Sequence, residues 1–212
     1  MHNLEEVAER IRHSFDARTD ARDQALAQTR TIIKYCAHAI RATHRNERDL
    51  ALENLRLAQN LGKDLKENLE EYPDLYHAGY TQNALKEYAE AKIVFALIDN
   101  GDLPDPEELD LPYSTYLQGL AEAAGELRRR CLDSLRKDNS KEAEQILSQM
   151  DDIYAVLITM DYPDAITGGL RRLTDIVRGV TERTRGDLTL SLRQEQLEKS
   201  LEQLENHLAR ER

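Results

Sequence analysis

The sequence is poor in the residues that mark several classes of protein. Its 212 residues include only two cysteines, Cys36 and Cys131, which stand far apart and form no Cys-x-x-Cys motif. This argues against a disulfide scaffold and against a zinc ribbon. Nine glycines and five prolines are too few for a loop-rich β-sandwich or a low-complexity chain. The length indicates one domain, or two very small ones. The scarcity of cysteine indicates a reducing compartment.

Long apolar runs are scarce as well. The N-terminal segment Met1–Phe15 holds no apolar stretch long enough for a signal peptide. No segment approaches the roughly 20 apolar residues that a membrane-spanning helix needs. We therefore expect a soluble, cytoplasmic protein without a membrane partner.

Basic residues are outnumbered by acidic ones. The chain has 29 lysines and arginines against 40 aspartates and glutamates, which gives a formal net charge of −11 at pH 7. A protein that coats duplex DNA with its outer surface normally carries the opposite sign. The charge argues against that class, but it leaves room for nucleic acid held in a locally basic interior.

Helix-forming residues dominate the composition, and apolar side chains recur at helical spacing throughout. No window shows the alternation of a strand. The spacing predicts helices over residues 4–15, 20–43, 50–69, 75–98, 114–135, 140–157 and 165–185. Long helices joined by short connections predict an all-α up-down bundle of about seven helices.

Local signals place several helix ends. Tyr72-Pro73 ends one helix, because a residue before proline avoids the α region. Asn100-Gly101 is typical of a helix C-cap, and Asn139-Ser140 of an N-cap. Between them, three prolines exclude a long helix from the connector 102–112.

The C-terminal segment carries a short leucine seam. We predict a single bundle domain over 1–189, followed by an amphipathic helical tail over 190–212. The tail leucines, at alternating spacings of four and three, are Leu197, Leu201, Leu204 and Leu208. Such a seam needs a partner helix.

One predicted helix carries acids on an apolar stripe. Positions three and four apart place Glu87 and Glu90 between apolar residues above and below. Neighbouring carboxylates repel and burial raises their pKa values, so a divalent cation would offset both costs. The alternative, which is more frequent for charged helical residues, is that both side chains reach water at the edge of the stripe.

A second acid pair, Glu122 and Glu126, lies one turn apart in the predicted helix 114–135. Gly119 and Gly125 share its face, and such small residues let another helix or a ligand come close. Four carboxylates on neighbouring helices would form an all-oxygen site suited to Mg²⁺ or Mn²⁺. The chain has no Glu-x-x-His element, so histidine ligation is not expected. The alternative is a solvated acidic face, or pairing with the arginines that follow.

The order and spacing of several motifs resemble the translin and translin-associated factor X (Trax) family over roughly residues 20–187. The motifs are Gln28-Thr29-Arg30, Thr43-His44-Arg45, Leu75-Tyr76-His77, Leu85-Lys86-Glu87-Tyr88-Ala89-Glu90-Ala91, Tyr116-Leu117 with Gly119-Leu120, Gly125-Glu126-Leu127 with Arg129, and Gly169-Leu170-Arg171-Arg172. The resemblance implies a helical bundle that assembles into a closed oligomer, commonly an octamer, and binds single-stranded RNA and DNA.

The factor X branch of that family contains metal-dependent endoribonucleases, whereas translin itself acts as a binding scaffold. Carried across, the catalytic and metal-binding acids fall on Glu87, Glu90 and Glu122, with Glu126 beside them. Glu122 stands where family enzymes more often have aspartate, which is one methylene shorter. Because Glu87 and Glu90 are retained, the chain is more similar to the nuclease branch.

The resemblance therefore implies a Mg²⁺- or Mn²⁺-dependent endoribonuclease that acts on single-stranded RNA within a homo-octameric cage. The alternative is a non-catalytic oligomer that binds single-stranded RNA or DNA. A third possibility is a purely structural helical assembly.

Aromatic and basic residues near the acid pairs are candidates for holding nucleic acid. Aromatic rings can stack on unpaired bases, and arginine donates two hydrogen bonds at once to a phosphate. The candidates are Tyr76, His77, Tyr80, Arg128, Arg129, Arg171, Arg172, Arg183 and Arg185. The alternative for each arginine is an ion pair with a nearby acid.

Overall fold

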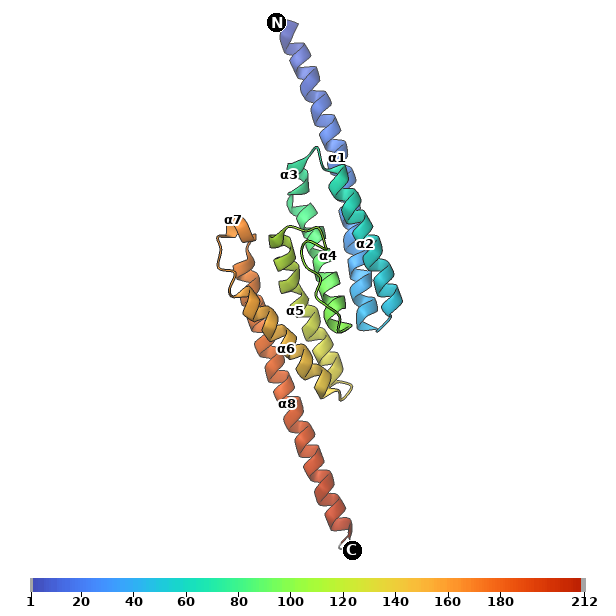
Figure 1. Ribbon diagram of the computed structural model, residues 1–212, viewed down its shortest axis with the longest axis vertical. Coiled ribbons are helices and arrows are strands. Elements are labelled where there is room, and N and C mark those ends of the chain that lie inside the picture. The colour runs from blue at the N-terminus through green and yellow to red at the C-terminus, as the bar shows by residue number, and fades with distance from the viewer. Residues whose placement is uncertain (1, 211–212) are drawn as a thin grey trace. The chain divides into compact units, whose positions relative to one another are not determined.

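The computed structural model describes residues 2–210, and within them the chain is helical with no strand (Figure 1). Its helices are α1 (His2–His44), α2 (Arg48–Asn68), α3 (Pro73–Tyr76), α4 (Gly79–Ile98), α5 (Tyr113–Leu135), α6 (Ser140–Leu157), α7 (Asp164–Thr167) and α8 (Leu170–Arg210). The predicted all-α class is confirmed. Met1 lies outside the described residues, as do Glu211 and Arg212 at the end of the predicted tail.

Helix α1 is longer than the sequence pattern predicts. We expected an interruption between Phe15 and Asp20, but the helix continues to His44. The intervening segment has neither glycine nor proline, and the Thr19 hydroxyl donates to the Phe15 carbonyl oxygen at 2.7 Å, a bond compatible with the helix. The predicted break after His44 is confirmed, because Asn46 turns the chain with φ +60°.

The last predicted helix and the tail form one helix, α8. Gly186 does not end it, because a glycine costs only about 1 kcal/mol inside a helix and Leu188, which is 4% exposed, anchors the next turn. The start of this helix also differs from the prediction, which placed it at residue 165, because α8 begins at Leu170. Gly168 and Gly169 take φ +62° and +84°, which separates the single turn α7 from α8.

Residue contacts divide the chain into two compact units, Met1–Gly119 and Leu120–Arg212. In the first unit α1 packs against α2 and α4, and its core includes Ile32, Leu65, Ile93 and Val94. In the second unit α6 packs along α8, and its core includes Leu127, Met150, Leu157 and Val177. The predicted division at residue 190 stays a prediction.

Helix α4 and the first turns of α5 run parallel. The Thr115 hydroxyl donates to Gln82 Oε1 at 2.5 Å, and one turn later Gly119 approaches Ala89. The connector between the two helices forms no long helix, as its prolines predict. It is tied down by Tyr116, whose hydroxyl donates to a connector carbonyl oxygen at 2.8 Å.

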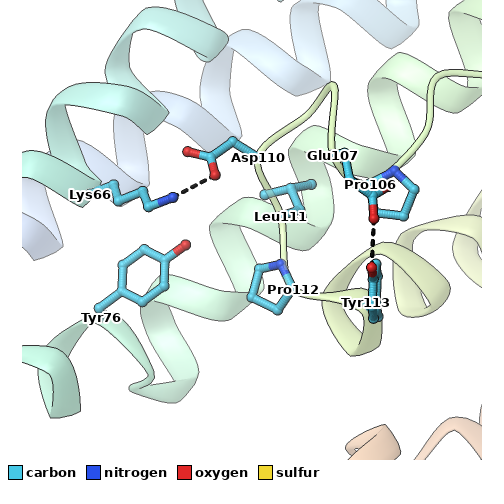
Figure 2. A pocket seen from close by; sticks show the side chains of 8 residues that line it. All are labelled: Lys66, Tyr76, Pro106, Glu107, Asp110, Leu111, Pro112 and Tyr113. Atoms are coloured by element: carbon cyan, nitrogen blue, oxygen red, sulfur yellow. Dashed lines mark hydrogen bonds and ion pairs between the residues drawn. The ribbon is translucent and has the colours of Figure 1, made fainter.

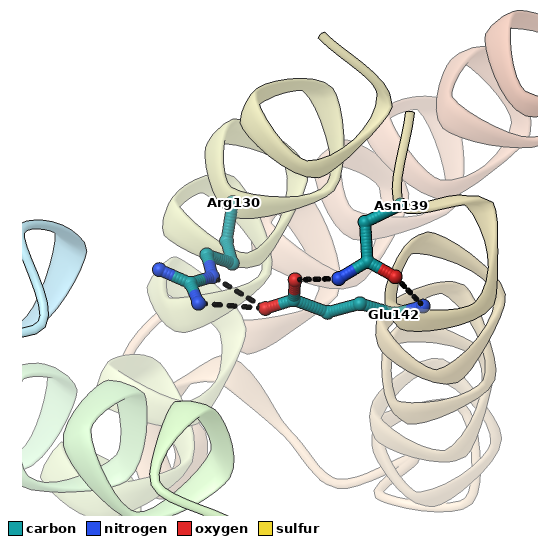
Figure 3. A network of polar contacts seen from close by, with 3 residues as sticks. All are labelled: Arg130, Asn139 and Glu142. Atoms are coloured by element: carbon teal, nitrogen blue, oxygen red, sulfur yellow. Dashed lines mark hydrogen bonds and ion pairs between the residues drawn. The ribbon is translucent and has the colours of Figure 1, made fainter. Parts of the chain in front are cut away.

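The predicted N-cap of α6 is confirmed. The Asn139 side-chain oxygen accepts a hydrogen bond from the Glu142 backbone N–H at 3.3 Å, and its amide donates to the Glu142 carboxylate at 2.8 Å. Arg130 pairs with the same carboxylate at 2.7 Å (Figure 3). Burial raises the pKa of Glu142, but the hydrogen bonds from Arg130 and Ser134 outweigh it, so the pKa lies below its ordinary value.

Both cysteines, Cys36 and Cys131, are buried free thiols, in agreement with the absence of a disulfide scaffold. Among the described helices, none combines the length and apolar character needed to cross a membrane.

Candidate metal centre

Gly119 brings the α5 backbone close to α4. A Cβ atom on this residue would lie 2.6 Å from the Ala89 Cβ and 2.9 Å from both the Glu90 amide nitrogen and the Lys86 carbonyl oxygen. Only glycine fits that spacing without movement of a backbone. The predicted close approach at Gly119 is therefore confirmed, whereas a Cβ on Gly125 would meet no described atom within 4 Å.

The close approach matters because acids flank it on both helices. Glu87 and Glu90 lie on α4, and Glu122 follows Gly119 by one turn on the continuous helix α5. Each of the three offers one carboxylate oxygen, and these oxygens lie within 4.8 Å of one another. Glu90 is 9% exposed, so at least one of these acids does not sit at a solvated edge.

The donor set fits a hard divalent cation. The group contains three carboxylates and no histidine or cysteine, and oxygen ligands of this kind suit Mg²⁺ or Mn²⁺. Three negative charges at this spacing repel one another strongly away from bulk water. A cation that shares the space would turn that repulsion into attraction.

Glu126, the fourth predicted acid, is not part of this group among the described residues. It lies one turn beyond Glu122, and its Oε2 is 3.5 Å from Arg129 Nη1. Its predicted role in the site stays a prediction.

The sequence pattern did not reveal that a lysine side chain, Lys86, lies beside the acids. Lys86 is only 13% exposed at its side chain, and its Nζ lies 3.6 Å from Glu87 Oε1. Lysine is rarely buried to this extent without a partner. The signal was available as a lysine inside the acidic motif, four residues before Glu90.

Helix α1 contributes a thiol to the same neighbourhood. Burial raises the pKa of Cys36, and the negative charges of Glu87 and Glu90 raise it further. The Tyr88 hydroxyl is buried and has no hydrogen-bond partner among the described residues. Burial raises the pKa of Tyr88, and interaction with Cys36 raises it further. Two buried groups that ionise with difficulty, Cys36 and Tyr88, therefore lie near the α4 acids.

The three aromatic candidates for contact with nucleic acid differ in their surroundings. Tyr76 lines a cavity of about 410 Å³ (Figure 2), and its ring meets that of the exposed His77 edge-to-face at 5.1 Å. Burial raises the pKa of the Tyr76 hydroxyl, whereas neighbouring Lys66 lowers it. The Tyr80 hydroxyl is buried without a partner among the described residues. Of the three, His77 is the one that offers an exposed ring.

The candidate arginines separate into two groups. Arg128 pairs with Asp187 at 2.9 Å, Arg185 pairs with Asp151 at 2.6 Å, and Arg129 pairs with Glu126. For these three the alternative of an ion pair holds. The candidate arginines that are exposed and form no ion pair within residues 3–209 are Arg171, Arg172 and Arg183.

The sequence is similar to a known protein family. A profile of the Translin family matches residues 20–209. An uncharacterized protein of Methanocaldococcus jannaschii is 31% identical over 192 residues, which cover 90% of this chain and 85% of that protein.

Solved structures are similar as well. AfC3PO in complex with duplex RNA is 29% identical with a TM-score of 0.78, over 89% of this chain and 96% of that chain. Apo-NeC3PO has a TM-score of 0.80 over 87% and 96% of the two chains, and at 22% identity it supports the fold alone.

Proposed function

Because the chain belongs to the Translin family, we propose that it binds RNA as an oligomer and cleaves it as a metal-dependent endoribonuclease. The observation that carries this proposal is the group of three carboxylates, Glu87, Glu90 and Glu122, with oxygens within 4.8 Å of one another. We further propose that the oligomer is a homo-octameric cage that encloses these sites.

In the proposed reaction, Glu87, Glu90 and Glu122 would hold Mg²⁺ or Mn²⁺. A bound divalent cation neutralises charge that develops on the phosphate and lowers the pKa of an attacking water. Glu126 is our candidate for accepting the proton of that water, because it lies one turn from Glu122 and outside the carboxylate group. The water oxygen would then bond to phosphorus, the bond from phosphorus to the departing oxygen would break, and that oxygen would take up a proton from solvent.

The form of the RNA is a separate part of the proposal. Resemblance to the family implies single strands, whereas the similar AfC3PO structure contains duplex RNA. We propose single-stranded RNA as the substrate and test the duplex beside it. Exposed Arg171, Arg172 and Arg183 are suited to the phosphates because they lack competing ion pairs among the described residues.

The test is cleavage of end-labelled RNA, single-stranded and duplex, with Mg²⁺, with Mn²⁺ and with EDTA. We expect cleavage only with a metal, and a loss of at least roughly 100-fold in Glu90→Gln, which removes one charge with little change of shape. Glu53→Gln, an exposed site on α2, is the matched control and keeps full activity. Equal cleavage by Glu90→Gln and the natural chain would show that the carboxylate group is not the active site.

A non-catalytic RNA-binding oligomer is the second candidate. It is favoured by Glu122, which is longer than the aspartate that resemblance to family enzymes implies at this position. This candidate predicts salt-sensitive RNA binding in the same assay without metal-dependent products.

A further inference from the structure

Lys86 lies at the contact between α4 and the start of α5. Its carbonyl oxygen is one of the atoms that a Cβ on Gly119 would meet at 2.9 Å. On α4 it precedes Glu90 by four residues, so the two share a helix face. Its side chain is 13% exposed and is therefore enclosed with the acids rather than extended into water.

The lysine is paired with the adjacent acid along the chain. Successive residues on a helix point in different directions and do not normally face each other. Lys86 Nζ nevertheless lies 3.6 Å from Glu87 Oε1, and the Glu87 side chain is 28% exposed. The long lysine stem can bend toward the carboxylate, where its charge opposes the repulsion among the acids.

The charges of Lys86 and the three acids indicate how this lysine affects metal binding. Lys86 brings one positive charge beside Glu87, and a divalent cation bound by the three carboxylates would bring two more. Like charges a few ångströms apart oppose each other, and the repulsion is stronger where the groups are partly shielded from water. The Lys86 ammonium, 3.6 Å from Glu87 Oε1, is therefore expected to oppose the entry of a cation.

We propose that Lys86 is the resident counter-ion of the Glu87–Glu90–Glu122 group, and that it weakens the binding of divalent cations while it stabilises the metal-free fold. This inference rests on the proposed function, since it assumes that these acids hold the metal. Lys86 would then affect both the stability of the metal-free fold and the cation concentration at which the acids bind the metal.

The experiment is a Mn²⁺ titration of the full chain, followed by the electron paramagnetic resonance of free Mn²⁺. We expect Lys86→Gln to bind Mn²⁺ about tenfold more tightly than the natural chain, because a repelling charge is gone. Lys86→Arg keeps the charge and is expected to bind within about twofold of the natural chain. Lys92→Gln is the matched control. It lies on the same helix, where burial lowers the pKa of Lys92 and Glu108 opposes that shift, and no change is expected.

A second readout is thermal unfolding with and without Mn²⁺. Without the metal, Lys86→Gln is expected to melt several degrees below the natural chain, because three acids lose their counter-ion. Saturating Mn²⁺ is expected to remove that difference. Lys92→Gln shows no such metal-dependent recovery.

The outcomes separate the two proposals. If the natural chain and Glu90→Gln bind Mn²⁺ equally, or not at all, the proposed metal centre fails and this inference fails with it. If Glu90→Gln loses Mn²⁺ while Lys86→Gln binds as the natural chain does, the metal centre stands and the counter-ion role is overturned. Equal tightening in Lys86→Gln and Lys92→Gln would also overturn it, because the effect would then be one of net charge.

Discussion

Gly119 leaves no room for a side chain against Ala89: a Cβ on residue 119 would lie 2.6 Å from the Ala89 Cβ. Real Cβ atoms do not come so close, so any side chain here must push α5 away from α4. Glu122 follows by one turn on α5. The absence of a methyl group at one position therefore governs where a candidate ligand can lie.

Gly119→Ala is expected to destabilise the fold by about 1–3 kcal/mol, as overpacking does, and to weaken Mn²⁺ binding because Glu122 is displaced. Gly125→Ala, six residues later, meets no described atom within 4 Å. It is expected to keep Mn²⁺ binding and to stabilise the helix by up to about 1 kcal/mol. Urea unfolding and Mn²⁺ titration measure both. Unchanged Mn²⁺ affinity in Gly119→Ala would contradict the role of the close approach.

The two thiols are expected to resist alkylation in the folded protein. Burial raises the pKa of Cys131 to about 11, although Arg128 lowers it in part, and Cys36 is shifted in the same direction. Because a raised pKa leaves little thiolate at pH 8, iodoacetamide labelling is expected to be slow until denaturant is added. Mass spectrometry of the labelled chain gives the extent. Rapid labelling of Cys36 at pH 8 would show that the α1–α4 contact opens readily.

Loss of the α6 cap is expected to be measurable on its own. Asn139→Ala removes the side chain that accepts from the Glu142 backbone N–H, and we expect a loss of about 1 kcal/mol in the free energy of unfolding. Ser140→Ala, next to it, leaves that acceptor in place and serves as the control. Equal losses in both variants would argue against a specific cap.

The charge on Glu142 is expected to make part of the stability depend on pH. Its pKa is lowered in the folded protein, so its contribution is present above the ordinary value of 4.5 and disappears as the pH falls through the lower folded-state value. Glu142→Gln is therefore expected to be less stable than the natural chain at pH 7 and equally stable near pH 2. Exposed Glu144→Gln provides the control. A difference that persists at low pH would point to packing rather than charge.

The two groups of arginines are expected to differ in RNA binding. Arg171 and Arg172 are exposed and form no ion pair among the described residues, so replacing both with alanine is expected to weaken binding and to reduce the salt dependence by about two phosphate contacts. Arg185→Ala removes a side chain that is held by Asp151 at 2.6 Å. A smaller effect is expected there. Filter binding at several salt concentrations compares them, and equal effects would contradict the division.

Local patterns predicted the features that depend on local chemistry. Helical phase placed Glu87 and Glu90 on one stripe, and Asn139 was identified as a cap because its side chain needs only the turn that follows it. The continuity of α1 and α8 was missed, because a polar segment or a lone glycine weakens a helical pattern without ending the helix.

Contacts between distant segments could not be read from periodicity. Nothing in the spacing shows that Cys36 of α1 lies in the field of the α4 acids, or that Lys86 bends toward Glu87. Likewise, glycine spacing marked Gly119 and Gly125 alike, and only the fold distinguishes the packed position from the open one. Helical spacing suggested the acids as a possible metal site but equally allowed a solvated face, and only the resemblance to a family favoured the metal site.

Beyond Leu188, helix α8 continues for about six turns without burying a residue of this chain among those described, and Leu197, Leu201, Leu204 and Leu208 are each more than half exposed. Most helical stability in proteins comes from packing of an amphipathic face, and here the leucine face is exposed. We therefore expect this end of α8 to fray first wherever no second helix covers the leucines.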